Sequence, residues 1–502
     1  MLADLIHALL DILINFKLIV LVVVGAGLGI LGGAMPGLSA PGALAISLSF
    51  TYSMSALEGV SFLAAIYTGA QYGGSITATL LNTPGAPESA VMTLDGFELT
   101  RRGLARKALQ GSIWAGFVGG FFGIAFLLII LGTVADEAAR FGPVQYTSLA
   151  IFGFVAMSSI AMGSRVKALA AAMLGLLFSM VGLDPITATP RYTFGSADFY
   201  GGLPLVPVLI GLFAVSEGLI LVERGLLVSA SDAQKRIGFG WSDFVACWRA
   251  MGIGSAVGLA IGVLPGGGAS IASWLAYSLA RTTSKQASQY GKGALDGLLA
   301  PEAADKAMVG ASLVPLLALG VPSTASAGVI IGGFELHNIV PGPDLLKSQP
   351  GLVFAIIAAL VVANCAVFLW GQALVPLLLR VRAIQPAVLG VSVLVLSLIG
   401  TYAFNGVVFS MILSVATGIF GYFLRKAEFP LAPIILGMLL GPIFDQNLRR
   451  ALIASNGSLL PFVEDPISLV LLALAACFLL AIVLVAIARR GKAPTARVTF
   501  DE

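Results

Sequence analysis

Charged residues are scarce in this 502-residue chain, at 11% of the sequence, whereas soluble domains have about 25%. Hydrophobic residues make up 58%, and the mean hydropathy is +0.99. Because this number of charges is too small to cover a water-exposed surface, lipid is the expected solvent for the outer face. The composition excludes an ordinary soluble domain. A net charge of +3 without a basic tract gives no indication of nucleic-acid binding.

Residues that build common catalytic and metal sites are also few. The chain has two histidines, His7 and His337, and three widely separated cysteines in apolar stretches. A His-based metal site or a disulfide framework is therefore not expected. The sequence contains no HExxH, GxSxG or GxxxxGK[ST] motif and no aspartate-rich prenyl diphosphate motif. We predict no enzyme activity and no cofactor, and without an ATP-binding motif any energy would come from an ion gradient or a partner.

Long apolar runs dominate the rest of the chain. A transmembrane helix needs about 20 mostly apolar residues. The predicted spans are 18–34, 60–81, 113–134, 146–162, 166–181, 203–222, 244–264, 309–333, 352–378, 387–402, 406–424 and 467–488. The pieces 43–53, 269–280 and 431–440 are too short and indicate half-helices or re-entrant segments. We predict an all-α integral membrane protein with about 10–14 membrane elements, preceded by an amphipathic helix at 3–15.

The two halves of the chain share a pattern of Gly/Pro interruptions. The sequence from Gly33 to Ser39 (GAMPGLS) corresponds to that from Gly262 to Ser270 (GVLPGGGAS), and a second break follows in each half, at 81–87 and at 319–324. Paired breaks of this kind indicate the binding site of a repeat-built transporter. The predicted units are a first membrane repeat at 15–230, a second membrane repeat at 240–488 and a cytoplasmic tail at 489–502.

Lys and Arg predict the relative orientation of the repeats. Loops 95–107 and 281–293, here called the basic loops, are rich in Lys and Arg. Loops 51–59 and 335–350, here called the opposite loops, contain Lys347 as their only Lys or Arg. Cytoplasmic loops carry the excess of Lys and Arg. Because the basic loops occupy non-equivalent positions in the two halves, the repeats are predicted to be inverted about an axis in the membrane plane.

The segment 72–90 (YGGSITATLLNTPGAPESA) predicts a broken helix at membrane depth. Two prolines and a glycine end the helix, and the freed backbone groups cost several kcal/mol unless they face protein or a water-filled cavity. A new helix start offers N–H groups and a positive dipole end to a carboxylate. The alternative is a Pro kink that serves packing, with Ser and Thr satisfying the backbone.

The segments around 265–274 and 300–307 carry further candidates. Three successive glycines followed by serines favour a ligand or ion loop, although Gly29, Gly33 and Gly37 in the first half are also typical of close helix packing. Pro301 beside Glu302 is a helix-start signal, and Asp305 and Lys306 are placed to pair with Glu302. The functional alternative for Glu302 is an ion-coupling carboxylate or a gate.

These segments give the candidate site. The predicted substrate-binding residues are Ser39, Ser75, Thr77, Asn82, Thr83, Pro84, Gly85, Gly266, Gly267, Gly268, Ser270, Pro322, Ser323 and Thr324. The predicted ion-coupling or gate residues are Glu88 and Glu302, with Glu217 as a similar candidate. Hydroxyls, the Asn82 amide and helix N-termini would hold carboxylates, and unwound carbonyls would hold a cation.

Three long motifs resemble the large membrane subunit of the tripartite tricarboxylate transporters, the TctA family. They are YGGSITATLLNTPGAPESAV with LDGFELTRRGLARKAL, then LPGGGASIASWLAYSLA, then GKGALDGLLAPEAADKAMVGASLVPLLALGVPS. The resemblance implies a multi-pass permease of the bacterial inner membrane, a small membrane subunit and a periplasmic solute-binding protein as partners. It also implies uptake of a di- or tricarboxylate coupled to Na⁺ or H⁺.

The chain departs from the family at several of these positions. Family members often have PGLGP where Pro36 to Pro41 stands, Asn-Asn where Asp305-Lys306 stands, and Gly where Ser323 stands. The substrate is therefore left open within the carboxylates. Two other functions also stay open: a self-sufficient symporter without a binding protein, and an intramembrane enzyme acting on lipid-linked substrates.

Overall fold

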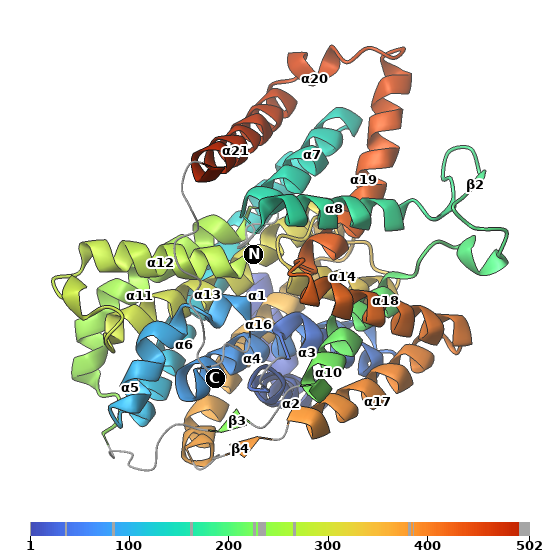
Figure 1. Ribbon diagram of the computed structural model, residues 1–502. Helices are drawn as coiled ribbons and strands as arrows, with labels where there is room; N and C mark the ends of the chain where they lie inside the picture. The colour runs from blue at the N-terminus through green and yellow to red at the C-terminus, as the bar shows by residue number, and fades with distance from the viewer. Residues whose placement is uncertain are drawn as a thin grey trace.

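The chain folds mainly into helices (Figure 1). The computed structural model describes residues 2–35, 38–82, 86–160, 164–223, 227–228, 237–264, 268–379, 383–384 and 386–490. Within these ranges the strands are two-residue segments, which pair as β1 with β2 and as β3 with β4. The predicted all-α class and the amphipathic helix at the N-terminus, α1 (Leu2–Ile14), are confirmed.

The elements follow the chain in two stretches. The first contains α2 (Phe16–Gly33), α3 (Ala40–Thr51), α4 (Ala56–Leu81), η1 (Pro87–Ser89), η2 (Thr93–Phe97), α5 (Glu98–Arg101), α6 (Ala105–Ala138), α7 (Pro143–Ile160), α8 (Arg165–Ser179), β1 (Gly182–Leu183), β2 (Pro190–Arg191), η3 (Ala197–Phe199), α9 (Leu205–Leu209), η4 (Ile210–Val215), α10 (Ser216–Glu223) and β3 (Leu227–Val228). The second contains α11 (Trp241–Gly262), α12 (Ala269–Thr283), η5 (Ala287–Gln289), α13 (Leu295–Leu319), α14 (Ala325–Leu336), α15 (Leu345–Ser348), α16 (Pro350–Leu378), β4 (Ala383–Ile384), α17 (Pro386–Asn405), α18 (Val408–Lys426), α19 (Ala432–Ala454), α20 (Pro461–Glu464) and α21 (Pro466–Arg490).

Helices α4 and α13 form the centre of the molecule. Every residue at 59–80 of α4 and at 297–318 of α13 is buried. Six of the described helices are long and apolar enough to cross a membrane, namely α2, α6, the continuous helix Leu205–Glu223, α11, α16 and α18. The two central helices are not among these six. Because neighbouring helices enclose them, α4 and α13 can carry polar side chains that a lipid-facing helix cannot.

The basic loops lie together at one end of the central helices. Thr100 Oγ1 donates to Thr79 O near the end of α4, at 2.7 Å. Asp95 Oδ1, in the same loop, accepts the N–H of Ala294 at the start of α13, also at 2.7 Å. The end of α4 and the start of α13 therefore meet the same loop.

The opposite loops lie together at the other end. His337 packs against Gly59 at the start of α4, and Pro341 packs against Gly320 at the end of α13. The two central helices therefore run antiparallel, with both basic loops at one end and both opposite loops at the other. This is the arrangement that inverted repeats require.

The two halves also exchange their outer helices. Helix α6 of the first half packs along α13, and α16 of the second half packs along α4. Helices α7 and α8 pack on α19, whereas α17 and α18 pack on α10 and η4. In the same way α3 packs on α14, and α12 packs on η1. Each contact has a counterpart in the other half, which supports a pseudo-two-fold axis, while the exact repeat boundaries stay a prediction.

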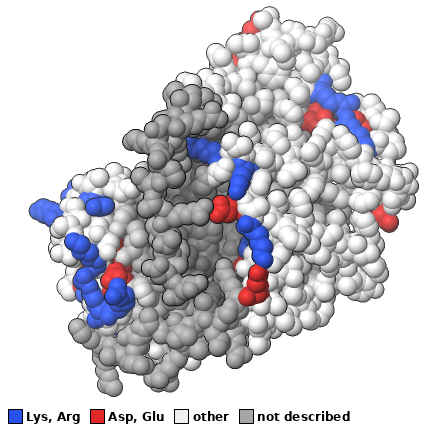
Figure 2. All heavy atoms as spheres, viewed as in Figure 1, with Lys and Arg blue, Asp and Glu red and all other residues white. Residues whose placement is uncertain are grey.

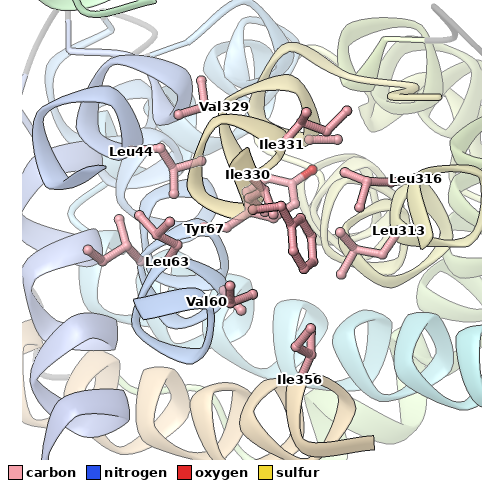
Figure 3. Close-up of a cluster of buried hydrophobic side chains, with 14 of the residues drawn as sticks. Leu44, Val60, Leu63, Tyr67, Leu313, Leu316, Val329, Ile330, Ile331 and Ile356 are labelled. Atoms are coloured by element: carbon pink, nitrogen blue, oxygen red, sulfur yellow. The ribbon is translucent and has the colours of Figure 1, made fainter. Parts of the chain in front are cut away.

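The largest apolar cluster of the described residues joins the halves around the middle of α4 (Figure 3). In this view Leu44 of α3 and Leu63 of α4 lie with Ile330 of α14, Leu313 of α13 and Ile356 of α16. All five side chains are almost completely buried. The core therefore does not divide at the boundary between the halves.

Glycines bring the long helices into backbone contact. A Cβ at Gly29 or Gly33 of α2 would collide with the backbone of α4, at Ile66 and Ala70. On α11, a Cβ at Gly254 or Gly258 would collide with the carbonyls of Ala300 and Ala304 on α13 in the same way. Small residues permit this approach between membrane helices. The packing interpretation of Gly29 and Gly33 is confirmed.

Two predicted helix boundaries were wrong. Pro301 was expected to begin a helix, which gave Glu302 a structural role at its start, but α13 begins at Leu295 and contains Pro301. The apolar piece 431–440 was expected to be a half-helix or a re-entrant segment that ends near residue 440, but the helix that contains it, α19, continues to Ala454. In both cases polar residues that the hydropathy pattern places outside the membrane are paired with other parts of the protein.

Arg449 on α19 shows this pairing. Its guanidinium lies 2.8 Å from Asp184 Oδ2 in the loop between α8 and α9, and Asp184 also pairs with Arg191. Burial alone would raise the pKa of Asp184, but hydrogen bonds from the N–H groups of Thr187 and Ile186 and from Arg449 outweigh it and hold the pKa below its usual range. The cluster anchors this loop to the end of α19.

Charge occupies little of the outer surface. On the face shown in Figure 2, charged side chains gather in a few small groups, one of them where Figure 1 shows α5, α11 and α12. Large apolar side chains are exposed on the outer helices, including Phe122, Ile129 and Ile399. An apolar surface of this kind suits a lipid environment.

Candidate functional site

The chain breaks of each half lie beside the middle of its central helix. In the first half, a Cβ at Gly73 of α4 would meet the backbone at Gly33 and Ala34, where α2 ends, and one at the adjacent Gly74 would lie 3.8 Å from Ala86. The two breaks of this half therefore approach α4 at neighbouring residues.

The second half repeats this geometry on α13. At the end of α11, Gly262 packs against Met308 and Ala311. In the second break, Ser323 Oγ donates to Ser312 O at 3.4 Å. Both breaks again contact the central helix, at residues that lie within about one helical turn of each other. The sequence-based expectation that the interruptions gather at one level agrees with these contacts.

A buried ionic cluster joins α4 and α13 at this level. Lys306 Nζ lies 2.8 Å from Glu302 Oε1 and 2.8 Å from Asp305 Oδ2. It also donates to Gln71 O at 2.9 Å and to Ser75 Oγ at 3.4 Å. Gln71 Nε2 donates to the other carboxylate oxygen of Asp305, at 2.9 Å. The pairing of Lys306 with Glu302 was expected, but its pairing with Asp305 and its two partners on α4 were not.

A second polar contact lies nearby on the same helices. The hydroxyl of Tyr67 shares hydrogen bonds with Ser312 Oγ, at 3.3 Å, and with Thr324 Oγ1, at 3.4 Å. Thr324 also accepts the N–H of Ala327 and so caps the start of α14. One tyrosine of the first half thus fixes the second break of the other half.

The predicted residues at the first break of each half lie at helix starts. Ser39 precedes α3, and its hydroxyl makes no capping hydrogen bond to that helix. Gly268 precedes α12 with φ of 57°, a value that favours glycine, and Ser270 lies half-buried in the first turn. Gly266 and Gly267 lie outside the described residues. These helix starts and the Ser39 hydroxyl are available to an anion.

The predicted residues at the second breaks have mixed environments. Thr77 is buried and donates to Gly74 O of its own helix, so its hydroxyl is already satisfied. Asn82 ends α4 in the left-handed region, with φ of 53°, and is exposed. Pro322 and Ser323 are buried beside α13. Thr83, Pro84 and Gly85 lie outside the part of the chain that the structure describes.

The three candidate carboxylates lie in three different environments. Glu302 is fully buried in the ionic cluster. Glu88 is half-buried on η1, which packs against α12. Glu217 on α10 pairs with Arg425 of α18, so it has a structural partner far along the chain. Glu302 and Glu88 thus stay candidates for ion coupling, and Glu217 is explained as an ion pair.

Asp95 is a buried residue whose role was not predicted from the sequence. Its Oδ1 accepts the N–H groups of Gly293 and Ala294 at 2.8 and 2.7 Å, and its Oδ2 accepts the hydroxyl of Tyr277 at 3.0 Å. A carboxylate of the first half therefore satisfies free donors at the start of α13. The only signal in the sequence is an acidic residue beside basic ones, which does not reveal its partners.

A cavity of about 640 Å³ lies at the basic end, along one face of α12. Trp274, Tyr277, Ser278 and Arg281 line it at helical spacing. Ser270 stands one turn before Trp274 on the same helix. This face leads from the break before α12 toward the basic loops.

Together these features define a multi-pass membrane transporter. Buried helices that are broken at one level, with helix starts and buried charges around them, are the arrangement that secondary transporters use to bind solutes. A profile of the family described as "Tripartite tricarboxylate transporter TctA family" matches residues 19–436. The chain belongs to this family, and the resemblance proposed from the three motifs is confirmed.

Two curated relatives come from Agrobacterium vitis. One, "Uncharacterized 52.8 kDa protein in TAR-I ttuC' 3'region", is 36% identical over 466 residues, which cover 91% of this chain and 92% of the relative. The other, "Uncharacterized protein in TAR-II ttuC' 3'region", is 37% identical over 226 residues, which cover 45% of this chain and 93% of the relative. No solved structure matches this chain.

Proposed function

We propose that this chain is the large permease subunit of a binding-protein-dependent secondary transporter in the bacterial inner membrane. It imports a di- or tricarboxylate, and a Na⁺ or H⁺ gradient drives the import. Its partners are a small membrane subunit and a periplasmic solute-binding protein that delivers the substrate. Membership of a tripartite transporter family supports both partners.

One observation carries the substrate class: helix starts follow the chain breaks beside α4 and α13. Ser39, Gly268 and Thr324 precede α3, α12 and α14, whose first N–H groups and positive dipole ends favour an anion. A site with starts from both halves suits a solute with two or more carboxylates. Neutral hydroxyls such as that of Ser39 add donors.

The orientation follows from the basic loops. Because Lys and Arg favour the cytoplasmic side, the end that carries both basic loops faces the cytoplasm, and the opposite loops face the periplasm. A binding protein would then dock at the opposite loops, and the substrate would leave past Arg281.

The test is uptake of labelled di- and tricarboxylates into proteoliposomes from which one component is omitted at a time. The proposal predicts uptake only when the binding protein, the small subunit and an ion gradient are all present. Gradient-driven uptake without the binding protein would instead establish the self-sufficient symporter. Absence of carboxylate uptake under every condition would refute the substrate class.

A further inference from the structure

The ammonium of Lys306 sits in a cage of oxygen atoms from both halves of the protein. Glu302, Asp305, Gln71 and Ser75 place four oxygens around Nζ at 2.8 to 3.4 Å. These oxygens belong to two carboxylates, a backbone carbonyl and a hydroxyl. The Lys306 side chain is only 5% exposed.

The cage offers more oxygen than a lysine requires. An ammonium has three N–H donors, and four acceptors surround this one. A fifth acceptor in the cluster, Gln71 Oε1, is buried and receives no hydrogen bond from the described residues. Several carboxylate, carbonyl and hydroxyl oxygens converging on one point are the ligands that hard cations take, and broken helices of transporters bind Na⁺ in this way.

The surrounding packing keeps the ammonium in this position. Gly116 of α6 lies against the stem of Lys306, where a Cβ would come within 3.2 Å of its Cγ. Gln71 Nε2 holds Asp305 by its second oxygen. The carboxylate of Asp305 is thus held by a contact that does not depend on the ammonium.

We propose that Lys306 is a built-in cation that occupies an alkali-cation site between α4 and α13. The charge of Lys306 holds the carboxylates of the cage without an exchangeable ion, so a Na⁺ that drives transport would bind elsewhere. Removing the side chain while leaving its oxygen ligands converts the cage into a Na⁺ site. This inference rests on the cage itself and does not depend on the proposed carboxylate substrate.

Thermal unfolding of the detergent-purified chain, titrated with NaCl against choline chloride and KCl at constant ionic strength, tests the proposal. Lys306→Ala opens the position of Nζ and is expected to gain a saturable, Na⁺-specific rise of about 3 °C in the unfolding temperature. Lys306→Met fills the same space without charge and is expected to gain none. The wild type and Lys426→Ala, which removes an exposed lysine paired with Glu223, serve as controls without a Na⁺-specific response.

Binding of radioactive Na⁺ to the purified variants gives a second readout. Lys306→Ala should bind about one Na⁺ more than the wild type. An equal response to Na⁺, K⁺ and choline in Lys306→Ala would overturn the proposal. If Lys306→Ala does not fold in Na⁺ buffer while the charge-free double variant Glu302→Gln/Lys306→Met does, the cage does not accept an alkali ion and the proposal is also overturned.

Discussion

At the scale of single residues, Asn82 has two separable roles. Its backbone ends α4 in the left-handed region, and its amide is a predicted substrate ligand. Left-handed geometry costs most non-glycine residues about 1–2 kcal/mol, whereas asparagine and glycine adopt it readily. Stability and substrate affinity can therefore be separated by two substitutions at this position.

Asn82→Ala is expected to lower both stability, by about 1 kcal/mol, and the apparent affinity for the carboxylate. Asn82→Gly keeps the backbone geometry and removes the amide, so it should unfold near the wild-type temperature yet still lose affinity. Thermal unfolding and the KM of uptake measure the two effects. If Asn82→Gly transports with the wild-type KM, the amide does not bind the substrate.

Asp95 is expected to stabilise the start of α13 through its hydrogen bonds. Asp95→Ala leaves the N–H groups of Gly293 and Ala294 without their acceptor in a buried position, which costs about 1–3 kcal/mol for each group that stays unsatisfied. A marked fall in unfolding temperature is expected. Asp95→Asn keeps an acceptor oxygen, so its unfolding temperature should fall less than that of Asp95→Ala. Equal stability of Asp95→Ala and the wild type would contradict this role.

At the scale of elements, glycines decide how closely α11 approaches α13. A Cβ at Gly254 would collide with Ala300 O, whereas Gly252 on the same helix has no atom within 4 Å of its Cβ position. Gly254→Ala is expected to destabilise the protein by about 1–3 kcal/mol through overpacking, and Gly252→Ala to be neutral or slightly stabilising. Thermal unfolding of the pair checks this, and equal effects would show that α11 does not depend on contact at Gly254.

The positions at which helices break are the feature of these elements that the sequence predicts well. The breaks near Ser39, Asn82 and Pro322 are visible because Gly and Pro end helices locally, whatever the tertiary structure. The start of α13 was misplaced because Glu302, Asp305 and Lys306 read as a polar break. Their charges are paired inside the protein, and a pairing with Gln71, in the other half of the chain, leaves no local trace.

At the scale of the whole molecule, the two halves are interlocked rather than side by side. Helix α6 of the first half packs on α13, and helix α16 of the second half packs on α4, so each lies on the central helix of the other half. The distribution of Lys and Arg predicted the relative orientation, because that rule acts on whole loops. The sequence did not predict the exchange of helices, because helix packing depends on shape at specific residues such as Gly119 and Gly123, where a Cβ on α6 would meet the backbone of α13.

Oppositely oriented halves place both basic loops at one end of the molecule and therefore on one side of the membrane. Labelling of single cysteines by a membrane-impermeant maleimide tests this placement, in a background without Cys247, Cys365 and Cys477. The exposed positions to compare are Arg102 and Lys285 in the basic loops and Ser53 and Val340 in the opposite loops. We expect Arg102→Cys and Lys285→Cys to react from the cytoplasmic side only, and Ser53→Cys and Val340→Cys to react from the periplasmic side only. Reaction of Arg102→Cys and Lys285→Cys from different sides would show that the basic loops do not share one side of the membrane.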